Sequence, residues 1–297
     1  HMEKCAVQGY NRHGTFHLFN VSHARVSLAS SRFTDNRIER LFRGGDSVFW
    51  LEDVKIHANV FPEETTLAIL FELAGSELWM RRSSVTDHRY DHGGAGGYFN
   101  VFYLNNSTDK TNSFACIEHS TLSGNEMLGD PFLLSNALFV VRGSGYPGLF
   151  LRHNTIANNR LGGPGTFPIL RSEFMEEFPR IRHEIQNNIF SSNRGTLFGG
   201  YESQGGNLFS NNPPEAHASD LVNTDARLYP LTLGANGTLH RPLRPGSPAI
   251  DAAPVLLVSR LDGRTGSRFR NGDGMGGAEP DIGAIESGRV LVVTTEA

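Results

Sequence analysis

Cysteine is almost absent from this chain of 297 residues, since only Cys5 and Cys116 occur. The two lie far apart in the sequence and match no metal-ligand spacing, which excludes a cysteine-based zinc site and a disulfide-stapled scaffold. We therefore expect two free or buried thiols in preference to a disulfide.

Long apolar runs are also missing. No stretch approaches the roughly 20 consecutive apolar residues that a membrane-spanning helix needs, so we expect no membrane span. No signal peptide is visible, but the chain opens with His1-Met2, which is typical of the remnant of an expression tag. A native leader could have been removed there, so the missing signal does not argue against secretion.

Lysine is scarce, with only Lys4, Lys55 and Lys110 among 27 basic residues. The net charge of -4 gives no basic excess, which argues against a nucleic-acid binder. Nearly all positive charge is arginine, whose planar fork pairs with carboxylates, so we expect stacked surface ion pairs or an acidic ligand. A P-loop, a dinucleotide fingerprint and a G-x-S-x-G elbow are all lacking.

What the chain does have is an internal repeat rich in asparagine and serine. The central apolar residues of its copies are Phe33, Ile56, Val85, Leu122, Ile156, Phe190 and Phe209. The residues three positions later are Asn36, Asn59, His88, Asn125, Asn159, Asn193 and Asn212. The residues two positions before the centre are Ser31, Val54, Ser83, Ser120, Asn154, Asn188 and Asn207. Apolar residues recur five positions before the centre, at Leu28, Leu51, Met80, Ile117, Leu151 and Ile185.

This spacing describes a strand, a corner, a second short strand and another corner. Asparagine suits a corner because it tolerates left-handed backbone geometry, and stacked amides can bond one another from coil to coil. The sequence therefore predicts an all-β, single-stranded, right-handed parallel β-helix, a solenoid of stacked coils. A helical solenoid would need a period of three to four residues, and a β-propeller would need longer, even repeats.

The repeat spacing is uneven, because the central residues are between 19 and 37 positions apart. A coil of about 20 to 25 residues fits the short intervals. The long intervals predict loop insertions at 91–113, 129–147 and 162–181, which are rich in glycine, proline, asparagine and aspartate. Coils are expected over 1–225, followed in the same domain by a closing region over 226–297.

The closing region carries three short motifs: Gly246-Ser247-Pro248-Ala249-Ile250-Asp251, Leu261-Asp262-Gly263-Arg264 and Asp281-Ile282-Gly283-Ala284-Ile285-Glu286. Here the chain resembles the C-terminal region of bacterial extracellular right-handed β-helix proteins of the choice-of-anchor Q type. The first and last motifs match that pattern closely. The middle one is looser, because Gly266 and Arg268 only approximate the usual spacing.

The resemblance implies a secreted or surface-exposed bacterial protein, tied to polysaccharides or to adhesion. It assigns no catalytic residues, because the motifs belong to the part that closes the helix. From the residues themselves we expect this segment to be a C-terminal cap, in which Asp251 and Asp281 pin turns, because the open edge of a solenoid must be covered. The start of the chain shows no such cap, so coils could precede it, and an end-to-end dimer is a further expectation.

Two outward columns of the repeat carry charge. Four positions before the centre, Glu52, Arg81, Glu118 and Arg152 alternate in sign, which predicts a surface ion-pair ladder. One position further on are Arg82, His119 and His153. A guanidinium beside two imidazoles could neutralise a uronate carboxylate and remove a proton, as a β-eliminating lyase requires. Polar corner residues without a catalytic role are the simpler interpretation.

The densest set of titratable groups is the segment 87–98, which holds Asp87, His88, Tyr90, Asp91 and His92 ahead of a glycine-rich run. His88 stands where the repeat expects asparagine, and such departures often mark functional sites. In a lyase or epimerase, His88 or His92 would be the base and Tyr90 the acid, with Arg82 as the carboxylate partner. Glycoside hydrolysis is less favoured, because no recurring acid completes a pair with Asp87 or Asp91.

The sequence leaves open whether the protein is an enzyme. One hypothesis is an extracellular lyase or epimerase acting on an acidic polysaccharide, with Arg82, His88, Tyr90, His92, His119 and His153 as catalytic candidates. The alternative is a non-catalytic surface module that binds cell-surface glycans. The run Asn271-Gly272-Asp273-Gly274 resembles part of a calcium loop without the full twelve-residue pattern, so calcium stays an open alternative, and no other cofactor is indicated.

Overall fold

The computed structural model describes residues 1–10, 17–63, 65–91, 98–106, 113–128, 136–143, 148–161, 168–173, 182–194, 196–197, 201–254, 262–263 and 279–287. These residues form strands β1 to β29 and no helix. Among them, accordingly, no helix has the length and hydropathy of a membrane span.

Most of the strands belong to four parallel sheets. Sheet A contains, in spatial order, β1 (Met2–Glu3), β4 (Arg25–Ala29), β7 (Val48–Glu52), β11 (Glu77–Arg81), β15 (Phe114–Glu118), β19 (Gly148–Arg152), β23 (Arg182–Gln186) and β26 (Glu202–Ser203). Sheet B contains β2 (Ala6–Gln8), β5 (Arg32–Thr34), β8 (Lys55–His57), β12 (Ser84–Thr86), β16 (Thr121–Ser123), β20 (Thr155–Ala157), β24 (Ile189–Ser191) and β27 (Leu208–Phe209).

The other two parallel sheets complete each coil. Sheet C contains β9 (Val60–Phe61), β13 (Arg89–Asp91), β17 (Glu126–Leu128) and β21 (Arg160–Leu161). Sheet D contains β3 (His17–Ser22), β6 (Arg40–Gly45), β10 (Leu67–Ala74), β14 (Tyr98–Asn106), β18 (Ala137–Gly143), β22 (Pro168–Glu173) and β25 (Thr196–Leu197). Outside these sheets, β28 (Thr232–Leu233) and β29 (Leu239–His240) form an antiparallel pair.

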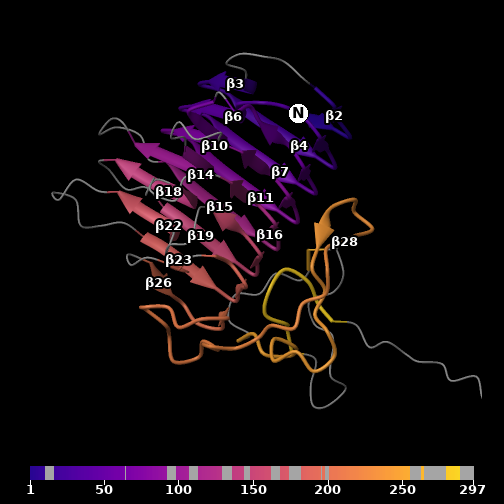
Figure 1. Cartoon of the computed structure of the whole chain (residues 1–297), viewed down its shortest axis with the longest axis vertical. Helices are drawn as coiled ribbons and strands as arrows, with labels where there is room; N and C mark the ends of the chain where they lie inside the picture. Colours follow the sequence, from indigo (N-terminus) through magenta and orange to yellow (C-terminus); the bar gives the residue numbers. More distant parts are fainter. Residues whose placement is uncertain are drawn as a thin grey trace, which may run out of the picture.

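The chain visits these sheets in a fixed order. It runs through β7, β8, β9 and β10 in sheets A, B, C and D, and then returns to sheet A as β11, the neighbour of β7. The register keeps equivalent repeat positions side by side, so that Val85 pairs with Ile56 and with Leu122. Figure 1 shows the resulting stack of strands. The protein is thus all-β with long parallel sheets, an arrangement compatible with the coil repeat in the sequence.

The corner between sheets A and B is made by one residue per coil with a positive φ. These residues are Lys4, Ser30, Asp53, Arg82, His119, His153 and Asn187, with φ between 45° and 54°. The corner after sheet B uses Asp35, Ala58, Asp87, Gly124, Asn158 and Ser192 in the same way. The prediction that the recurring asparagine itself takes the left-handed conformation is therefore wrong, because the residue before it takes that conformation.

The recurring asparagine instead turns inward and bonds the neighbouring coil. Asn125 Nδ2 donates to Asn159 Oδ1 over 2.8 Å and to the Val85 carbonyl oxygen over 3.2 Å. The Asn125 backbone N–H also donates to Asn159 Oδ1. A second ladder joins Asn154, Asn188 and Asn207. The predicted amide ladder is confirmed, and it satisfies buried polar groups that would otherwise be costly.

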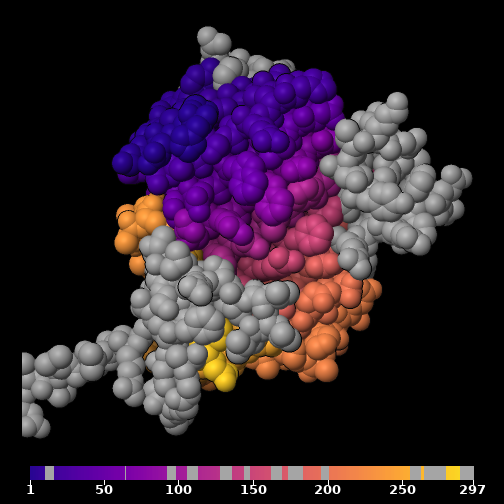
Figure 2. Space-filling view, turned by 180° about the vertical axis from the view of Figure 1, so that it is seen from behind, coloured from indigo at the N-terminus to yellow at the C-terminus, as the bar shows by residue number. Residues whose placement is uncertain are grey.

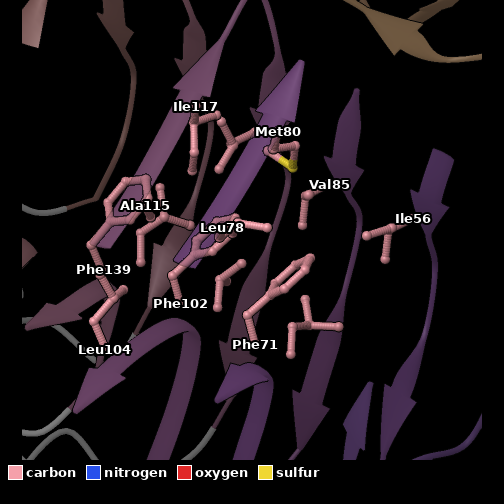
Figure 3. Packing of buried hydrophobic residues seen from close by; sticks show 14 of the residues in the cluster. Ile56, Phe71, Leu78, Met80, Val85, Phe102, Leu104, Ala115, Ile117 and Phe139 are labelled. Atoms are coloured by element: carbon pink, nitrogen blue, oxygen red, sulfur yellow. The ribbon is translucent and has the colours of Figure 1, made fainter. Parts of the chain in front are cut away.

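Apolar side chains fill the space between the sheets. The central residues Phe33, Ile56, Val85 and Leu122 have no exposed surface. Sheet D contributes a stack of rings in which the centroids of Phe42, Phe71, Phe102 and Phe139 follow one another at 4.8, 4.8 and 5.1 Å, that is, at about the strand spacing. Figure 3 shows Phe71, Phe102 and Phe139 beside residues of sheets A and B, and all belong to one core. Burying each ring stabilises the stack by roughly 2 to 3 kcal/mol.

The three predicted insertions are not loops throughout. Each contains a strand of sheet D: β14 lies in 91–113, β18 in 129–147 and β22 in 162–181. Those predictions are wrong on this point. The physical reason is that sheet D strands lie at variable distances from the asparagine marker, although Phe102 and Phe139 are as buried as any repeat centre.

The C-terminal segment, residues 226–254 with 262–263 and 279–287, packs back along the outer side of sheet B. The Leu239 N–H donates to Ser84 Oγ, Arg241 Nε to Ser123 Oγ and the Ala284 N–H to Thr155 Oγ1, over 3.0, 2.7 and 3.1 Å. The β29 strand contacts β12 of sheet B, and Figure 2 shows the C-terminal colours against the later coils from behind. We call this segment the cover.

Candidate ligand-binding site

His88 lies in the interior of the stack. Its side chain has no exposed surface, and Nδ1 accepts the backbone N–H of Asn59 over 3.1 Å, as an asparagine oxygen does elsewhere in the ladder. Burial lowers the pKa of His88 to about 3, so the ring is neutral. His88 therefore has the contacts of a ladder residue, and a substrate on the surface cannot reach it.

Tyr90 is also interior. It is fully buried against Phe61 and Phe99, and its hydroxyl donates to the Thr65 carbonyl oxygen. Burial raises the pKa of Tyr90 to about 12. His92 lies outside the described residues. The segment that the sequence singled out thus contributes two core side chains, neither of which faces a groove.

Arg82, His119 and His153 do form one column, as the repeat predicted. Arg82 bonds two carboxylates, with Nε 3.1 Å from Asp53 Oδ1 and a terminal nitrogen 2.7 Å from Glu52 Oε1. The His119 and His153 rings stack with centroids 5.1 Å apart and are 5% and 2% exposed.

The cover explains why this column is closed. Asn236 Nδ2 donates to Asp53 Oδ1 and to the carbonyl oxygens of Arg82 and Gly263. The Gly283 N–H donates to the Asn187 carbonyl oxygen over 2.9 Å. Gly263 approaches His119 so closely that a Cβ there would lie 2.7 Å from the His119 carbonyl oxygen. No groove joins Arg82, His88, Tyr90, His119 and His153, because two point inward and the others lie on a corner overlaid by the cover.

The last sequence motif is held together by buried carboxylates. Asp281 accepts the backbone N–H of Asp251 over 2.8 Å and that of Ser287. Glu286 accepts the Asp281 N–H, and Asp262 accepts the Glu286 N–H. Burial raises the pKa of Asp281 despite these bonds. Asp281 thus pins turns, while Asp251 contributes its backbone. The run 271–274 lies outside the described residues, and within the described ranges no cluster of His, Cys, Asp and Glu has the make-up of a metal site.

The outer face of sheet A is open by comparison. Its charged column places Arg81 Nε 2.8 Å from Glu118 Oε2 and Arg152 3.6 Å from Glu118 Oε1. Glu52 binds Arg82 in place of Arg81. The ladder predicted from the sequence is present between Arg81, Glu118 and Arg152.

Beside that column runs a row of aromatic residues that the sequence reading overlooked. Trp50 is 46% exposed, and its ring stacks on Trp79 with centroids 5.1 Å apart and planes 7° apart. Phe114 meets Trp79 edge-on at 5.2 Å. The strand alternation that buries Phe49 and Leu51 in β7 turns Trp50 outward.

A cavity of about 220 Å³ lies between the aromatic row and the charged column. Its lining residues are His1, Ser27, Leu28, Ala29, Trp50, Leu51, Glu52, Trp79 and Arg81. Ser27 pairs with Trp50 in the register, and its Oγ lies 3.0 Å from His1 Nδ1, so a short serine and the His1 ring border the cavity beside Trp50. We call this cavity the indole slot. It offers one aromatic face with a carboxylate and a guanidinium at its rim.

The signal for the indole slot was available in the sequence. Trp50 and Trp79 both stand six positions before a repeat centre, so they fall on one outward column. A second hollow of about 380 Å³ lies on sheet D, and among its lining residues are Tyr98, Asn100, Tyr103 and Arg142. Tyr98 follows the glycine-rich run that the sequence had marked.

No protein-family model matches this chain, and no curated protein is significantly similar to it. The resemblance of the C-terminal motifs to choice-of-anchor Q proteins therefore stays a prediction. The function is inferred from the residues themselves.

Proposed function

We propose that this chain is a right-handed parallel β-helix that binds glycans without catalysing a reaction, and that the indole slot is the binding site. The order of strands in sheets A, B and D, which follows the order of the chain, supports the β-helix. The strong preference of parallel crossovers for the right hand supports its handedness. A secreted or surface location belongs to the same proposal, since polysaccharides are met there.

The observation that carries the proposal is Trp50. Trp50 is 46% exposed and stacks on a second indole. Large aromatic side chains are mostly buried, so an exposed stacked pair indicates a binding surface. One face of a sugar ring presents C–H groups, which pack on an aromatic face, while its hydroxyls project sideways. In the indole slot those hydroxyls would meet Glu52 and Arg81, whose partners Arg82 and Glu118 hold them in place.

The same positions argue against the lyase or epimerase. A base and an acid for β-elimination must both touch the substrate, and the interior positions of His88 and Tyr90 leave no room for one. The carboxylate partner, Arg82, is already held by Asp53 and Glu52. A binding module needs none of these groups.

The test is a glycan array with neutral and uronate-containing polysaccharides, followed by titration of the hits with wild-type protein and with Trp50→Ala. We expect the variant to bind roughly tenfold or more weakly, as for a central aromatic contact. Leu233→Ala is the matched control, because Leu233 is 63% exposed and lies on β28, away from the slot. Equal binding by wild type and Trp50→Ala would rule the slot out.

The enzymatic alternative is tested on the same samples. Incubation with alginate, pectate and chondroitin, with and without calcium, is followed by the ultraviolet absorbance of unsaturated uronates. We expect none. New absorbance that is lost in Arg82→Ala would restore the lyase hypothesis and reject the non-catalytic one.

A further inference from the structure

A third hollow, which shares no lining residue with the indole slot or with the hollow on sheet D, lies where the cover meets the later coils. It measures about 430 Å³ and is lined by Asn158, Ser191, Ser192, Asp225, Arg227, Leu228, Arg241, Arg244 and Pro245. Asn158, Ser191 and Ser192 come from the coils, Asp225 immediately precedes the cover, and the other five residues belong to the cover. Its lining is strongly polar, in contrast to that of the indole slot.

Arg241 is the fixed cation of this hollow. Its Nε donates to Ser123 Oγ over 2.7 Å, and a terminal nitrogen donates to the Tyr229 carbonyl oxygen over 3.4 Å. With its amide oxygen turned toward Arg241, Asn158 accepts from both terminal nitrogens over 3.1 and 2.9 Å. Burial lowers the pKa of Arg241, and the negative charge of Asp87 opposes that effect. Arg241 thus contributes a positioned positive charge.

Arg227 is held in place by its backbone. Its φ is 50°, the left-handed conformation that the corner residues of this protein also adopt. The Arg227 N–H donates to Asp225 Oδ1 over 2.9 Å, which stabilises that turn. One terminal nitrogen donates to the Gly246 carbonyl oxygen over 3.0 Å.

Arg244 completes the set. Its guanidinium carbon lies 5.3 Å from the centroid of the Tyr229 ring, which positions the group without neutralising it. Among the described residues, Arg227, Arg241 and Arg244 make no ion pair within 4 Å of a carboxylate. Three guanidinium groups and the single carboxylate of Asp225 give the lining a formal charge of 3 − 1 = +2.

We propose that this hollow binds a tetrahedral oxyanion, that is, a sulfate or phosphate group. Such a dianion matches the charge of the lining, and its oxygens can accept from several guanidinium groups and from the Ser191 and Ser192 hydroxyls at once. Because the donors come from both the coils and the cover, the bound anion fastens the cover to the stack. The group could be a free ion or an ester on a glycan, and the chemistry of recognition is the same.

The experiment titrates wild-type protein with sodium sulfate and with sodium phosphate by calorimetry, at low millimolar concentrations and constant ionic strength. Thermal unfolding is followed in parallel, with sodium chloride as the reference. We expect a saturable one-to-one isotherm and a melting temperature that rises along the same curve. Arg244→Gln should weaken binding roughly tenfold, since a hydrogen bond to a charged group is lost. Within the described residues the exposed Arg244 side chain makes only its ring contact with Tyr229, and its backbone bond to Arg227 does not depend on the side chain, so this variant should keep the fold.

Arg227→Gln should weaken binding by a similar factor, and Arg32→Gln is the matched control because Arg32 is exposed on sheet B far from the hollow.

A monosaccharide sulfate ester is titrated in the last part of the experiment. Binding of the ester as well as the free ion would place the group on a glycan, and binding of the free ion alone would make the ligand inorganic. Non-saturable stabilisation that is equal in wild type and all three variants would be a general salt effect and would overturn the proposal. The result does not depend on glycan binding at Trp50.

Discussion

The outer faces of sheets A and B are built from the same coils, yet they have different environments. On sheet A, Trp50 and the Arg81–Glu118 pair face solvent. On the adjoining corner and on sheet B, His119, His153 and Thr155 are buried, because the cover lies over them. The sequence of a polar column on the outside of such a stack therefore does not show whether the column is exposed or buried. It is a surface ladder where nothing overlies it and part of the core where something does.

The comparison also separates two kinds of polar contact. Contacts beneath the cover satisfy groups that have lost water, so breaking one leaves an unpaired buried atom and costs about 1 to 3 kcal/mol. Contacts on the open face compete with water and salt, and each is worth at most about 1 kcal/mol. The same residue types should therefore respond differently to mutation on the two faces.

The largest effect is expected from Gly283→Ala, which should displace the cover from sheet B and expose the contacts beneath it to water. A Cβ there would lie 2.6 Å from Ile189 Cδ1 and 3.0 Å from Thr155 Oγ1, at a φ of +103°. We expect a loss of roughly 3 kcal/mol in the free energy of unfolding, combining backbone strain with overpacking. Amide exchange should accelerate in β20 and β24 but not in β15 of sheet A. Urea denaturation and hydrogen exchange measure the two effects.

Gly237→Ala is the matched control. Gly237 also has a positive φ, +81°, and it lies in the turn between β28 and β29, but nothing is within 4 Å of its would-be Cβ. Only backbone strain remains, so we expect a loss of about 1 kcal/mol. If the two variants lose the same stability, the cover is not packed tightly against sheet B.

His88 in the interior shows what full burial of a titratable group does to the pH dependence of stability. Its folded pKa of about 3 is below the unfolded value of 6.5, so between these pH values the unfolded chain binds a proton that the folded chain does not. Stability from this group is therefore present above pH 6.5 and is lost as pH falls toward 3. The slope is about 1.4 kcal/mol per pH unit.

His88→Asn should remove most of that slope, because asparagine does not titrate and already fills this column at Asn59 and Asn125. At pH 4.5 the variant should exceed wild type by about 2.5 kcal/mol relative to their difference at pH 7. His183, whose pKa burial lowers to about 4, remains in both proteins and accounts for residual acid sensitivity. Parallel stability curves for the two proteins would mean that His88 is accessible to protons in the folded state.

The interior could be predicted from the sequence because its signal is local and repeated. Ile56, Val85 and Leu122 occupy equivalent places in successive coils, and the amides of Asn125 and Asn159 mark the same corner each time. The aromatic pair of the indole slot could also have been predicted from the repeat, because Trp50 and Trp79 both stand six positions before the central residue of their repeat copy. Sheet D was harder, because its strands carry no polar marker at a constant distance.

A C-terminal cap was predicted, but its position along sheet B was not, and the expected groove depended on that position. Asn236 bonds Asp53 across 183 positions of sequence, and no spacing rule connects the two. Without that contact, Arg82, His119 and His153 look like a reactive column on an open corner. His88 failed differently: its departure from the asparagine pattern was read as a functional sign, whereas an imidazole nitrogen accepts the Asn59 N–H as an amide oxygen does.

The smallest loss in the free energy of unfolding is expected for a variant on the open outer face of sheet A. Glu118 meets Arg81 at 2.8 Å and Arg152 at 3.6 Å; the Glu118 side chain is 12% exposed, but those of its partners are 52% and 34% exposed, so water reaches the pair from the arginine side. Glu118→Gln should therefore cost at most about 1 kcal/mol at low salt, less as salt rises, since exposed pairs are screened. Glu202→Gln is the control, because Glu202 is exposed on β26 of the same sheet. A double-mutant cycle between Arg81→Gln and Glu118→Gln isolates the pair from other changes. A coupling of several kcal/mol that salt does not diminish would mean that the face is covered in solution, and the indole slot beside it would then be closed to a glycan as well.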